Sequence, residues 1–276
     1  MIRHAFCALA GAAALLTFTA AGFADNTVPK KSAVSTAAEI SSPVTASAAQ
    51  GAVLKIVPET QSSILRNKLF VHHVYKPENA SDQTIILMHG SGGNEQSLVS
   101  LASKIAPRAT LIGIRGRVTQ DGKNRWYKRI TPISFDQQDI REEADAFAAF
   151  VSDFATQQKI DLDRTIFLGY SNGANLLSSL SLLHPEIVHR AVLLRPMTVL
   201  NQIPAVSLKN SNFLTIAGRT DKLYAPFAPA LEDTLRKRGA NVEAHMIPSN
   251  HGLGAEDVKI VAEWIAGTGQ VASQTR

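Results

Sequence analysis

A serine, an aspartate and a histidine follow one another along the second half of this 276-residue chain. Ser171 lies in the run Gly169-Tyr-Ser-Asn-Gly173, and Asp221 and His251 come later in that order. A serine hydroxyl is a weak nucleophile until a base takes its proton, and a neutral imidazole is a base of suitable strength. A carboxylate beside the imidazole fixes its tautomer and stabilises its charged form. The three residues therefore predict nucleophilic catalysis, with Ser171 as the nucleophile, His251 as the base and Asp221 as the orienting acid.

The context of Ser171 strengthens this short motif. The bare pentapeptide is typical of an ordinary turn, but here the apolar run 165–168 precedes it and a helical pattern over 172–183 follows. A nucleophile on such a strand-to-helix turn needs glycine two positions before and after it, because the two backbones approach closely there. The order of serine, acid and histidine along the chain is also one that known triads use. We therefore prefer the catalytic interpretation of all three residues.

A glycine-rich segment upstream supplies the remaining part of such a site. The run His89-Gly-Ser-Gly-Gly-Asn94 follows a predicted strand, and its small residues allow backbone N–H groups to face a reacting carbonyl oxygen. We expect the backbone N–H groups of Ser91 and Asn172 to form the oxyanion hole. The alternative, a phosphate-binding loop, lacks both the lysine of a P-loop and the spacing of a dinucleotide-binding glycine motif. His89 is expected to support this loop structurally.

Strand and helix patterns alternate from residue 53 onward. Helical spacing of apolar residues is clearest over 140–154, with Asp136 and Asp139 at its start, and several strand runs are almost wholly apolar, as in strands covered on both faces. The expected strands are 69–75, 84–88, 109–114, 165–168, 191–194, 213–217 and 242–247, and the other expected helices are 94–105, 172–183, 226–238 and 256–265. The alternation predicts one α/β domain, residues 53–276, with a mostly parallel central sheet and helices on both faces.

Four motifs together carry a family resemblance. They are H-G-S-G-G-N-E at 89–95, R-G-R-V at 115–118, G-Y-S-N-G-A-N at 169–175 and the final His251-Gly252. Over about residues 65–266 the chain resembles the phospholipase/carboxylesterase group of α/β-hydrolases, which includes acyl-protein thioesterases, and it is most similar to the bacterial carboxylesterase branch. The resemblance implies a single-domain α/β-hydrolase fold and a serine ester hydrolase that uses no cofactor and no metal. Asn172 stands where the thioesterase branch has Gln, and Asn250 where glycine is common before the histidine.

The loops indicate the size of the expected substrate. About 18 residues separate the predicted strands 191–194 and 213–217, which leaves no room for an inserted lid domain. We therefore expect an open site for small or short-chain esters, hydrolysed through an acyl-enzyme. The alternative enzyme is a thioesterase or lysophospholipase with the same triad. The alternative outside enzymes is a non-catalytic hydrolase-fold protein of the cell envelope that binds a ligand.

The basic character of the chain is concentrated in one segment. The formal net charge is +5, and residues 115–129 hold six arginine or lysine side chains against a single aspartate. One interpretation places Arg115, Trp126 and Tyr127 at the substrate rim, where they would attract an anionic or aromatic ester. The other is a solvated loop with paired charges. A basic patch confined to one loop does not predict a nucleic-acid partner.

The first 24 residues have the layout of a secretory signal peptide. Arg3 precedes an uncharged run over 5–21, and the run Gly22-Phe-Ala24 supplies small residues for cleavage. The uncharged run is shorter than the roughly 20 residues needed to span a bilayer. We therefore expect cleavage, no stable membrane insertion afterwards and a periplasmic location, with an uncleaved anchor as the alternative. Residues 25–52, rich in alanine, serine and threonine, are expected to be a disordered linker.

Composition excludes several other classes of protein. The single cysteine, Cys7, falls within the expected signal peptide, which excludes a disulfide scaffold and a cysteine-based metal cluster. With 45% apolar and 18% charged residues, the chain is unlike a disordered protein. The remaining histidines show no metal-ligand spacing. The expected partner is a small ester, and the sequence does not specify an oligomeric state.

Overall fold

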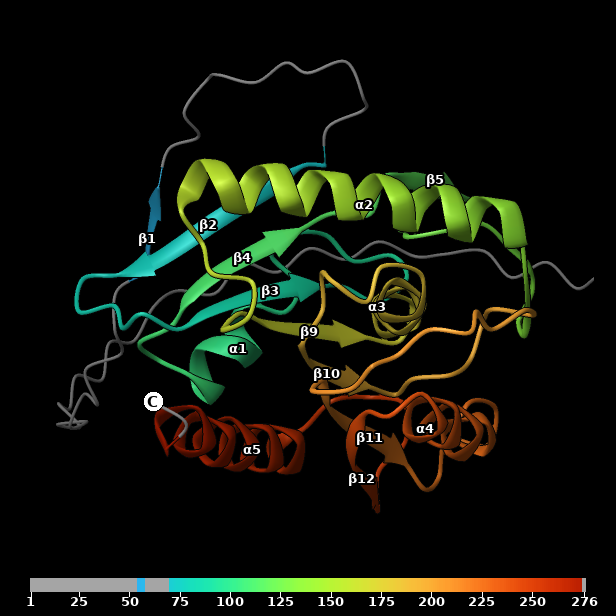
Figure 1. The fold of residues 1–276 in the computed structure, drawn as a ribbon. Coiled ribbons are helices and arrows are strands. Elements are labelled where there is room, and N and C mark those ends of the chain that lie inside the picture. Colours follow the sequence, from blue (N-terminus) through green and yellow to red (C-terminus); the bar gives the residue numbers. More distant parts are fainter. Residues whose placement is uncertain (1–53, 58–69, 275–276) are drawn as a thin grey trace, which may run out of the picture. The chain divides into compact units, whose positions relative to one another are not determined.

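An eight-stranded sheet runs through the middle of the fold, with its strands in the order β1-β2-β4-β3-β9-β10-β11-β12 (Figure 1). The strands are β1 (Leu54–Val57), β2 (His72–Pro77), β3 (Thr84–Met88), β4 (Thr110–Ile114), β9 (Ile166–Tyr170), β10 (Arg190–Leu194), β11 (Asn212–Gly218) and β12 (Asn241–Ile247). β2 pairs antiparallel with β1 and with β4, and the other neighbouring strands pair in parallel. The expected mostly parallel sheet is confirmed.

The computed structural model describes the backbone of residues 54–57 and 70–274 and the side chains of residues 70–267. These residues all belong to one compact unit, Ala49–Arg276. The expected signal peptide (1–24) and linker (25–52) lie outside the described residues.

Helices cover both faces of the sheet, as expected for this fold class. They are α1 (Val99–Ile105), α2 (Gln137–Gln158), α3 (Asn172–Leu183), α4 (Ala228–Lys237) and α5 (Ala255–Gln274), with a short 3-10 helix, η1 (Ala225–Phe227), before α4. Successive side chains of a strand point to opposite faces. In β3, Ile86 and Met88 pack into the core under α2, α3 and α4, whereas Ile85 and Leu87 pack into the core under α1 and α5.

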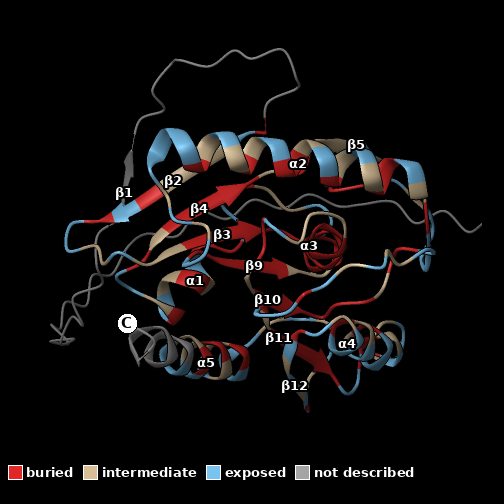
Figure 2. Cartoon of the chain, viewed as in Figure 1, coloured by how far each residue is buried: buried red, intermediate tan, exposed pale blue. Residues whose placement is uncertain are grey.

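The helices differ in how far they are buried. Figure 2 shows α3 buried almost throughout, whereas α2 exposes one side along its length. The expected pattern over 140–154 is the buried side of α2, and Asp136 caps the helix by accepting hydrogen bonds from the backbone N–H groups of Gln138 and Asp139. α3, which follows Ser171 directly, is thus held firmly between α2 and the sheet.

One expected helix begins later than its pattern indicates. The prediction of 94–105 is corrected to α1, which starts at Val99. The side chain of Asn94 accepts a hydrogen bond from the backbone N–H of Gln96 at 3.0 Å, and the hydroxyl of Ser97 accepts one from the N–H of Asn94 at 2.9 Å. Such local side-chain bonds compete with the helical backbone pattern, so the chain forms a turn first.

Two small hairpins between β4 and α2 were absent from the sequence prediction. β5 (Val118–Gln120) pairs with β6 (Lys123–Arg125), and β7 (Arg129–Thr131) pairs with β8 (Ser134–Phe135). These strands are two or three residues long and mostly polar, so they show no apolar alternation that a sequence pattern could reveal. The basic segment 115–129 is therefore folded back on itself.

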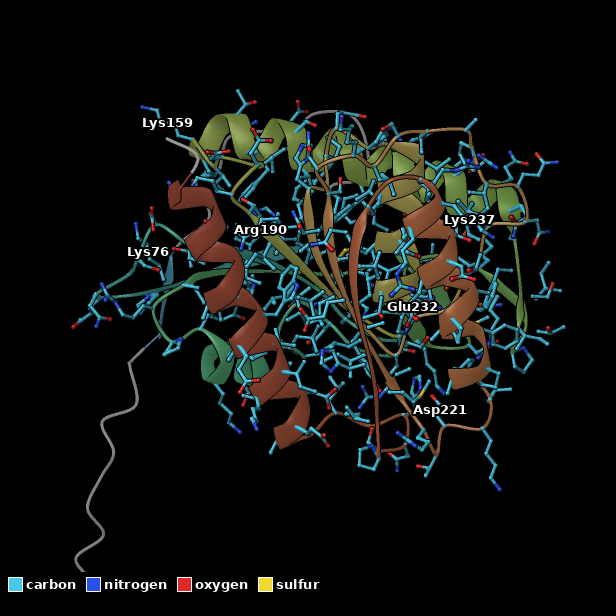
Figure 3. The ribbon with its side chains drawn as sticks, turned by 60° about the horizontal axis from the view of Figure 1, so that its bottom comes forward. Lys76, Lys159, Arg190, Asp221, Glu232 and Lys237 are labelled. Carbon is cyan, nitrogen blue, oxygen red and sulfur yellow. The ribbon has the colours of Figure 1, made fainter. Side chains whose placement is uncertain are left out.

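The parallel strands bring distant parts of the chain to one edge of the sheet. Ser91 follows β3, Ser171 follows β9, Asp221 follows β11 and His251 follows β12. The carboxyl ends of these strands meet at the same edge, where α/β folds place their sites. Arg190, at the start of β10, lies toward the other end of the strands from Asp221 (Figure 3).

Candidate active site

Ser171 occupies a strained turn between β9 and α3. Its φ and ψ angles are 51° and −114°, a combination that L-residues rarely adopt. A Cβ atom at Gly173 would lie 2.3 Å from the carbonyl oxygen of Met88, and one at Gly169 would lie 2.7 Å from the Cα atom of Ala174. Only glycine fits at either position, so the two glycines of the motif allow the sharp turn that presents the Ser171 hydroxyl.

A chain of hydrogen bonds joins the three residues singled out in the sequence. The Oγ atom of Ser171 lies 2.9 Å from Nε2 of His251, and Nδ1 of His251 lies 2.5 Å from Oδ2 of Asp221. In this arrangement the serine hydroxyl donates to Nε2 while the Nδ1–H donates to the carboxylate. The fold therefore brings together all three side chains, which lie far apart in the sequence.

Aromatic side chains hold this hydrogen-bonded chain in place. The other oxygen of Asp221 accepts a hydrogen bond from the backbone N–H of Tyr224 at 3.1 Å, and the ring of Tyr224 lies 4.9 Å from that of His251. On the other side, the hydroxyl of Tyr170 donates to the carbonyl of His251 at 3.0 Å. Asp221 is buried and His251 is about one-third exposed. The imidazole is therefore held by a buried carboxylate and remains accessible to a substrate.

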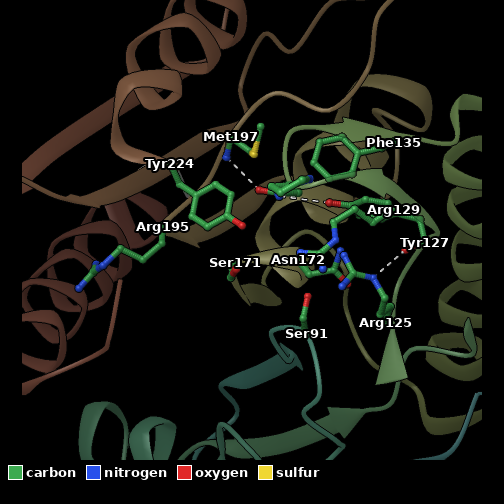
Figure 4. Close-up of a pocket in the computed structure, with 12 residues that line it drawn as sticks. Ser91, Arg125, Tyr127, Arg129, Phe135, Ser171, Asn172, Arg195, Met197 and Tyr224 are labelled. Atoms are coloured by element: carbon green, nitrogen blue, oxygen red, sulfur yellow. Dashed lines mark hydrogen bonds between the residues drawn. The ribbon is translucent and has the colours of Figure 1, made fainter. Parts of the chain in front are cut away.

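Two backbone N–H groups are available beside the serine. Among the described residues, neither the N–H of Ser91 nor that of Asn172 has a hydrogen-bond acceptor, whereas those of Gly92 and Gly93 donate to the carbonyls of Asn124 and Gly90. The N–H of Asn172 belongs to the first turn of α3, where no helical acceptor exists. Figure 4 shows Ser91 and Asn172 beside Ser171 in one pocket, where the expected oxyanion hole would lie.

His89 lies beneath the glycine-rich loop and is 1% exposed. Its Nδ1 lies 2.6 Å from the carbonyl oxygen of Gly90, and its Nε2 accepts a hydrogen bond from the backbone N–H of Gly116 at 3.0 Å. Burial lowers the pKa of this imidazole, which keeps it neutral with the proton on Nδ1. These contacts fit the structural role expected for His89.

The prediction that Arg115 and Trp126 lie at the substrate rim is wrong. The guanidinium of Arg115 forms two hydrogen bonds with Glu95, at 2.6 and 2.8 Å, and this hydrogen bonding lowers the pKa of Glu95. Trp126 is 0% exposed, and its indole N–H donates to the carbonyl of His89 at 2.8 Å. Neither residue lines the pocket, because both pack against the loop that carries Ser91.

Tyr127 lines the interior of the pocket and does not lie at its rim. Its ring is 0% exposed, and its hydroxyl accepts a hydrogen bond from the Asn175 side chain at 3.2 Å. Burial raises the pKa of Tyr127 to about 12, so the hydroxyl stays protonated. Asn175 also accepts a hydrogen bond from the backbone N–H of Met197 at 2.8 Å, which connects the floor of the pocket to the segment after β10.

Several pocket residues were not identified in the sequence. Apart from Asn175, which belongs to the 169–175 motif, they are Arg125, Arg129, Pro132, Phe135, Arg195, Met197 and Tyr224. Arg125 and Arg129 were counted in the basic segment, but the β5–β6 and β7–β8 hairpins decide which of its side chains face the pocket. The others carry no motif, and they reach the site only because β8 and β10 end beside it and η1 begins there.

Within the part of the chain that the structure describes, no group of three histidine, cysteine, aspartate or glutamate side chains is placed to hold a metal ion. No described helix is sufficiently long and apolar to cross a membrane.

Known proteins resemble the chain over most of its length. The carboxylesterase from Mesorhizobium loti is 48% identical, with a TM-score of 0.71 over 74% of this chain and 98% of that structure. The Bacillus cereus carboxylesterase is 28% identical, with a TM-score of 0.69 over 73% of this chain and 95% of that structure. A Bacillus subtilis (strain 168) protein named "Putative hydrolase MhqD" is 31% identical over 193 residues, which are 70% of this chain and 96% of that protein.

The family description that matches residues 70–268 is Phospholipase/Carboxylesterase. The match covers the hydrogen-bonded Ser171, Asp221 and His251, the glycine-rich loop and the sheet that positions them. The chain therefore belongs to the phospholipase/carboxylesterase family of α/β-hydrolases.

Proposed function

We propose that this protein is a serine-dependent carboxylic ester hydrolase that acts on small or short-chain esters through a Ser-His-Asp triad and an acyl-enzyme. The observation that carries the proposal is the hydrogen-bonded chain from Ser171 through His251 to Asp221. A serine in contact with a base that is itself oriented by an acid is the arrangement that activates a nucleophile. The family membership supports the same chemistry.

In the proposed mechanism each of these residues has one role. Nε2 of His251 takes the proton of Ser171 as Oγ attacks the ester carbon, and the same proton is then given to the leaving alcohol. Asp221 stabilises the imidazolium that forms between these steps. The negative charge on the carbonyl oxygen develops toward the N–H groups of Ser91 and Asn172. Water, activated by His251, then hydrolyses the acyl-enzyme and restores Ser171.

The dimensions of the pocket support a small substrate. Its cavity volume is ≈ 20 Å³, close to the roughly 10–15 Å³ that one water molecule occupies on this measure. The segment between β10 and β11, residues 195–211, contains no helix or strand that would cover the site as a lid. A long acyl chain would therefore have no enclosed apolar channel, so a short one is favoured.

Hydrolysis of p-nitrophenyl acetate, butyrate and octanoate by the purified protein tests this proposal. We expect kcat/KM to be higher for the two short esters than for octanoate. We expect Ser171→Ala to lower kcat at least about 10⁴-fold, with covalent labelling of Ser171 by a fluorophosphonate in the wild type only. A steady rise of kcat/KM with acyl length would contradict the short-chain assignment. Equal rates for the wild type and Ser171→Ala would contradict the role of Ser171 as the nucleophile.

Two other functions would give different results in the same assays. A thioesterase or lysophospholipase would hydrolyse an acyl thioester or a lysophospholipid with a much higher kcat/KM than any of the three esters. A hydrolase-fold binding protein would turn over none of them and would leave Ser171 unlabelled.

We further propose that residues 1–24 are removed during secretion and that the mature protein, beginning at Asp25, is periplasmic. The proposal rests on the uncharged run over 5–21 and the small residues Gly22 and Ala24. Sequencing the N-terminus of protein recovered from the periplasmic fraction is the test. A protein that still begins at Met1 and sediments with membranes would instead indicate an uncleaved anchor.

A further inference from the structure

Five of the six cations of the basic segment 115–129 fall into two groups, and the sixth, Lys123, is exposed. Three of them are neutralised by carboxylates: Arg115 pairs with Glu95 at 2.6 Å, Arg117 with Glu143 at 3.0 Å and Lys128 with Asp139 at 2.8 Å. Two others, Arg125 and Arg129, line the pocket that contains Ser171 and have no ion-pair partner among the described residues. The pocket thus keeps two cationic side chains that form no ion pair with a described carboxylate, although the charge of Asp121 in the same hairpin acts on Arg125 from farther away.

Arg125 is the more unusual of the two because it is 4% exposed. The hydrogen bond recorded for its guanidinium runs from Nε to the carbonyl of Tyr127 at 3.4 Å. Burial and the positive charge of Arg129 lower the pKa of Arg125, yet a guanidinium remains protonated in proteins. A buried cation without a paired anion is costly, so this arrangement is understandable if a ligand supplies the negative charge.

Both neighbours of Arg125 fix its position beside the reacting groups. The side chain of Asn124 donates to the carbonyl of Gly93 at 2.8 Å, in the loop that carries Ser91. The backbone N–H of Trp126 donates to Oδ1 of Asn172 at 2.7 Å. Figure 4 shows Arg125 and Arg129 on the Asn172 side of the pocket, across Ser171 from Tyr224 and Arg195. The two cations are therefore held next to the expected oxyanion hole.

The third arginine of the pocket does not share this property. Arg195 forms a buried ion pair with Asp257 at 2.8 Å, and its remaining donors bind Asn250, Gly252 and Ser249. Its charge is therefore neutralised within the protein, which leaves Arg125 and Arg129 as the unpaired cations among the residues that line the pocket.

We propose that Arg125 and Arg129 form an anion subsite, and that the preferred substrates are esters that carry a free carboxylate close to the ester group. The inference rests on the proposed ester hydrolysis and names its substrate class. A guanidinium binds a carboxylate through two parallel N–H donors.

Matched ester pairs that differ in charge at one position test the subsite. For a charge on the acyl side, the pair is mono-(4-nitrophenyl) glutarate and 4-nitrophenyl pentanoate. For a charge on the alcohol side, it is 4-acetoxybenzoate and 4-acetoxybenzamide. The measured quantity is the ratio of kcat/KM for the charged ester to that for the neutral one, after the uncatalysed rate is subtracted. We expect this ratio to be about 10 or more for one of the two pairs, either the acyl-side or the alcohol-side pair.

Three variants localise the effect. Arg125→Gln and Arg129→Gln should each lower this ratio about 10-fold, because each removes a charged donor from the carboxylate. Lys123→Gln is the matched control, since Lys123 belongs to the same hairpin and is exposed but does not line the pocket. It removes the same charge and should leave the ratio unchanged. Because Arg125 is buried, Arg129→Gln keeps the test decisive if Arg125→Gln does not fold.

The outcomes separate this inference from the proposed function. If the wild type hydrolyses the neutral esters but does not favour either charged ester, the subsite is wrong and the esterase stands. If Arg125→Gln and Arg129→Gln lower kcat/KM equally for charged and neutral esters, the arginines stabilise the oxyanion generally and the subsite is again wrong. A wild type that hydrolyses no ester overturns the proposed function, and the subsite with it.

Discussion

The guanidinium of Arg195 and the carboxylate of Asp257 form a buried ion pair with two hydrogen bonds, 2.8 and 3.0 Å long. The exposed fractions of the two side chains are 0% and 1%. The same guanidinium donates to the carbonyls of Asn250 and Gly252, at 3.0 and 2.7 Å. These are the residues on either side of His251, so the ion pair fixes the loop that presents the imidazole to Ser171.

Asp257→Asn should therefore affect both stability and catalysis. Removing one partner leaves the Arg195 charge buried and unpaired, which is expected to lower the free energy of unfolding by about 3–5 kcal/mol. We also expect kcat to fall more than KM changes, because a looser loop misplaces His251 without removing a substrate contact. Urea unfolding and p-nitrophenyl butyrate kinetics measure the two effects.

The matched control for this variant is Asp82→Asn. Asp82 pairs with Arg164 on the surface, where the side chains are 73% and 53% exposed, and an exposed pair contributes little. Equal losses of stability in the two variants would contradict the importance of the buried pair. An unchanged kcat in Asp257→Asn would contradict its role in positioning His251.

Asp221→Asn tests the orienting acid separately from the nucleophile. An amide at this position can donate a hydrogen bond to Nδ1, which favours the imidazole tautomer that cannot accept the Ser171 proton. We expect kcat for p-nitrophenyl acetate to fall about 10⁴-fold with the fold retained. Asp233→Asn, a change of the same kind on the exposed side of α4, is the control. A loss of less than about 10-fold for Asp221→Asn would remove Asp221 from the triad.

The sequence was sufficient to predict the three residues that now lie in one hydrogen-bonded chain. Ser171 is defined by its two glycines, whose neighbours leave no space for a Cβ atom. Asp221 and His251 follow strands of a parallel sheet, and the carboxyl ends of such strands must meet at one edge. Local chemistry and topology therefore placed these residues without knowledge of any individual contact.

The orientation of the basic segment could not be predicted in the same way. The partners of Arg115, Arg117 and Lys128 come from the glycine-rich loop and from α2, between 11 and 26 residues away in the sequence. Only the folded chain shows that these three are neutralised while Arg125 and Arg129 face the pocket. Trp126 and Tyr127 were expected at a rim because they lie among cations, yet both are buried, since large aromatic side chains gain most by leaving water.

Asn172→Ala tests the contact that joins the nucleophile turn to the basic segment. Oδ1 of Asn172 accepts the backbone N–H of Trp126 at 2.7 Å, and both residues are buried. The alanine variant leaves that N–H without an acceptor, which should lower the free energy of unfolding by about 1–3 kcal/mol. The backbone N–H of residue 172 is retained, so catalysis should fall much less than in Asp221→Asn. Asn201→Ala, at an exposed position, should change neither quantity, and a matching loss there would contradict the assignment.

His89→Gln tests a pH dependence of stability that follows from the burial of His89. Burial lowers the pKa of this imidazole in the folded protein, whereas in the unfolded chain it titrates near its ordinary value of about 6.5. As the pH falls below that value, the unfolded chain binds a proton that the folded protein does not, so the wild type loses stability until the folded pKa is reached.

Glutamine at position 89 can still accept a hydrogen bond from the N–H of Gly116 but does not titrate. The difference in free energy of unfolding between wild type and variant, measured by urea unfolding from pH 8 downward, should therefore shift in favour of the variant once the pH passes below about 6.5. Parallel profiles would show that His89 takes up a proton in the folded protein as readily as in the unfolded chain, and the buried imidazole that stays neutral beneath the Ser91 loop would then be wrong.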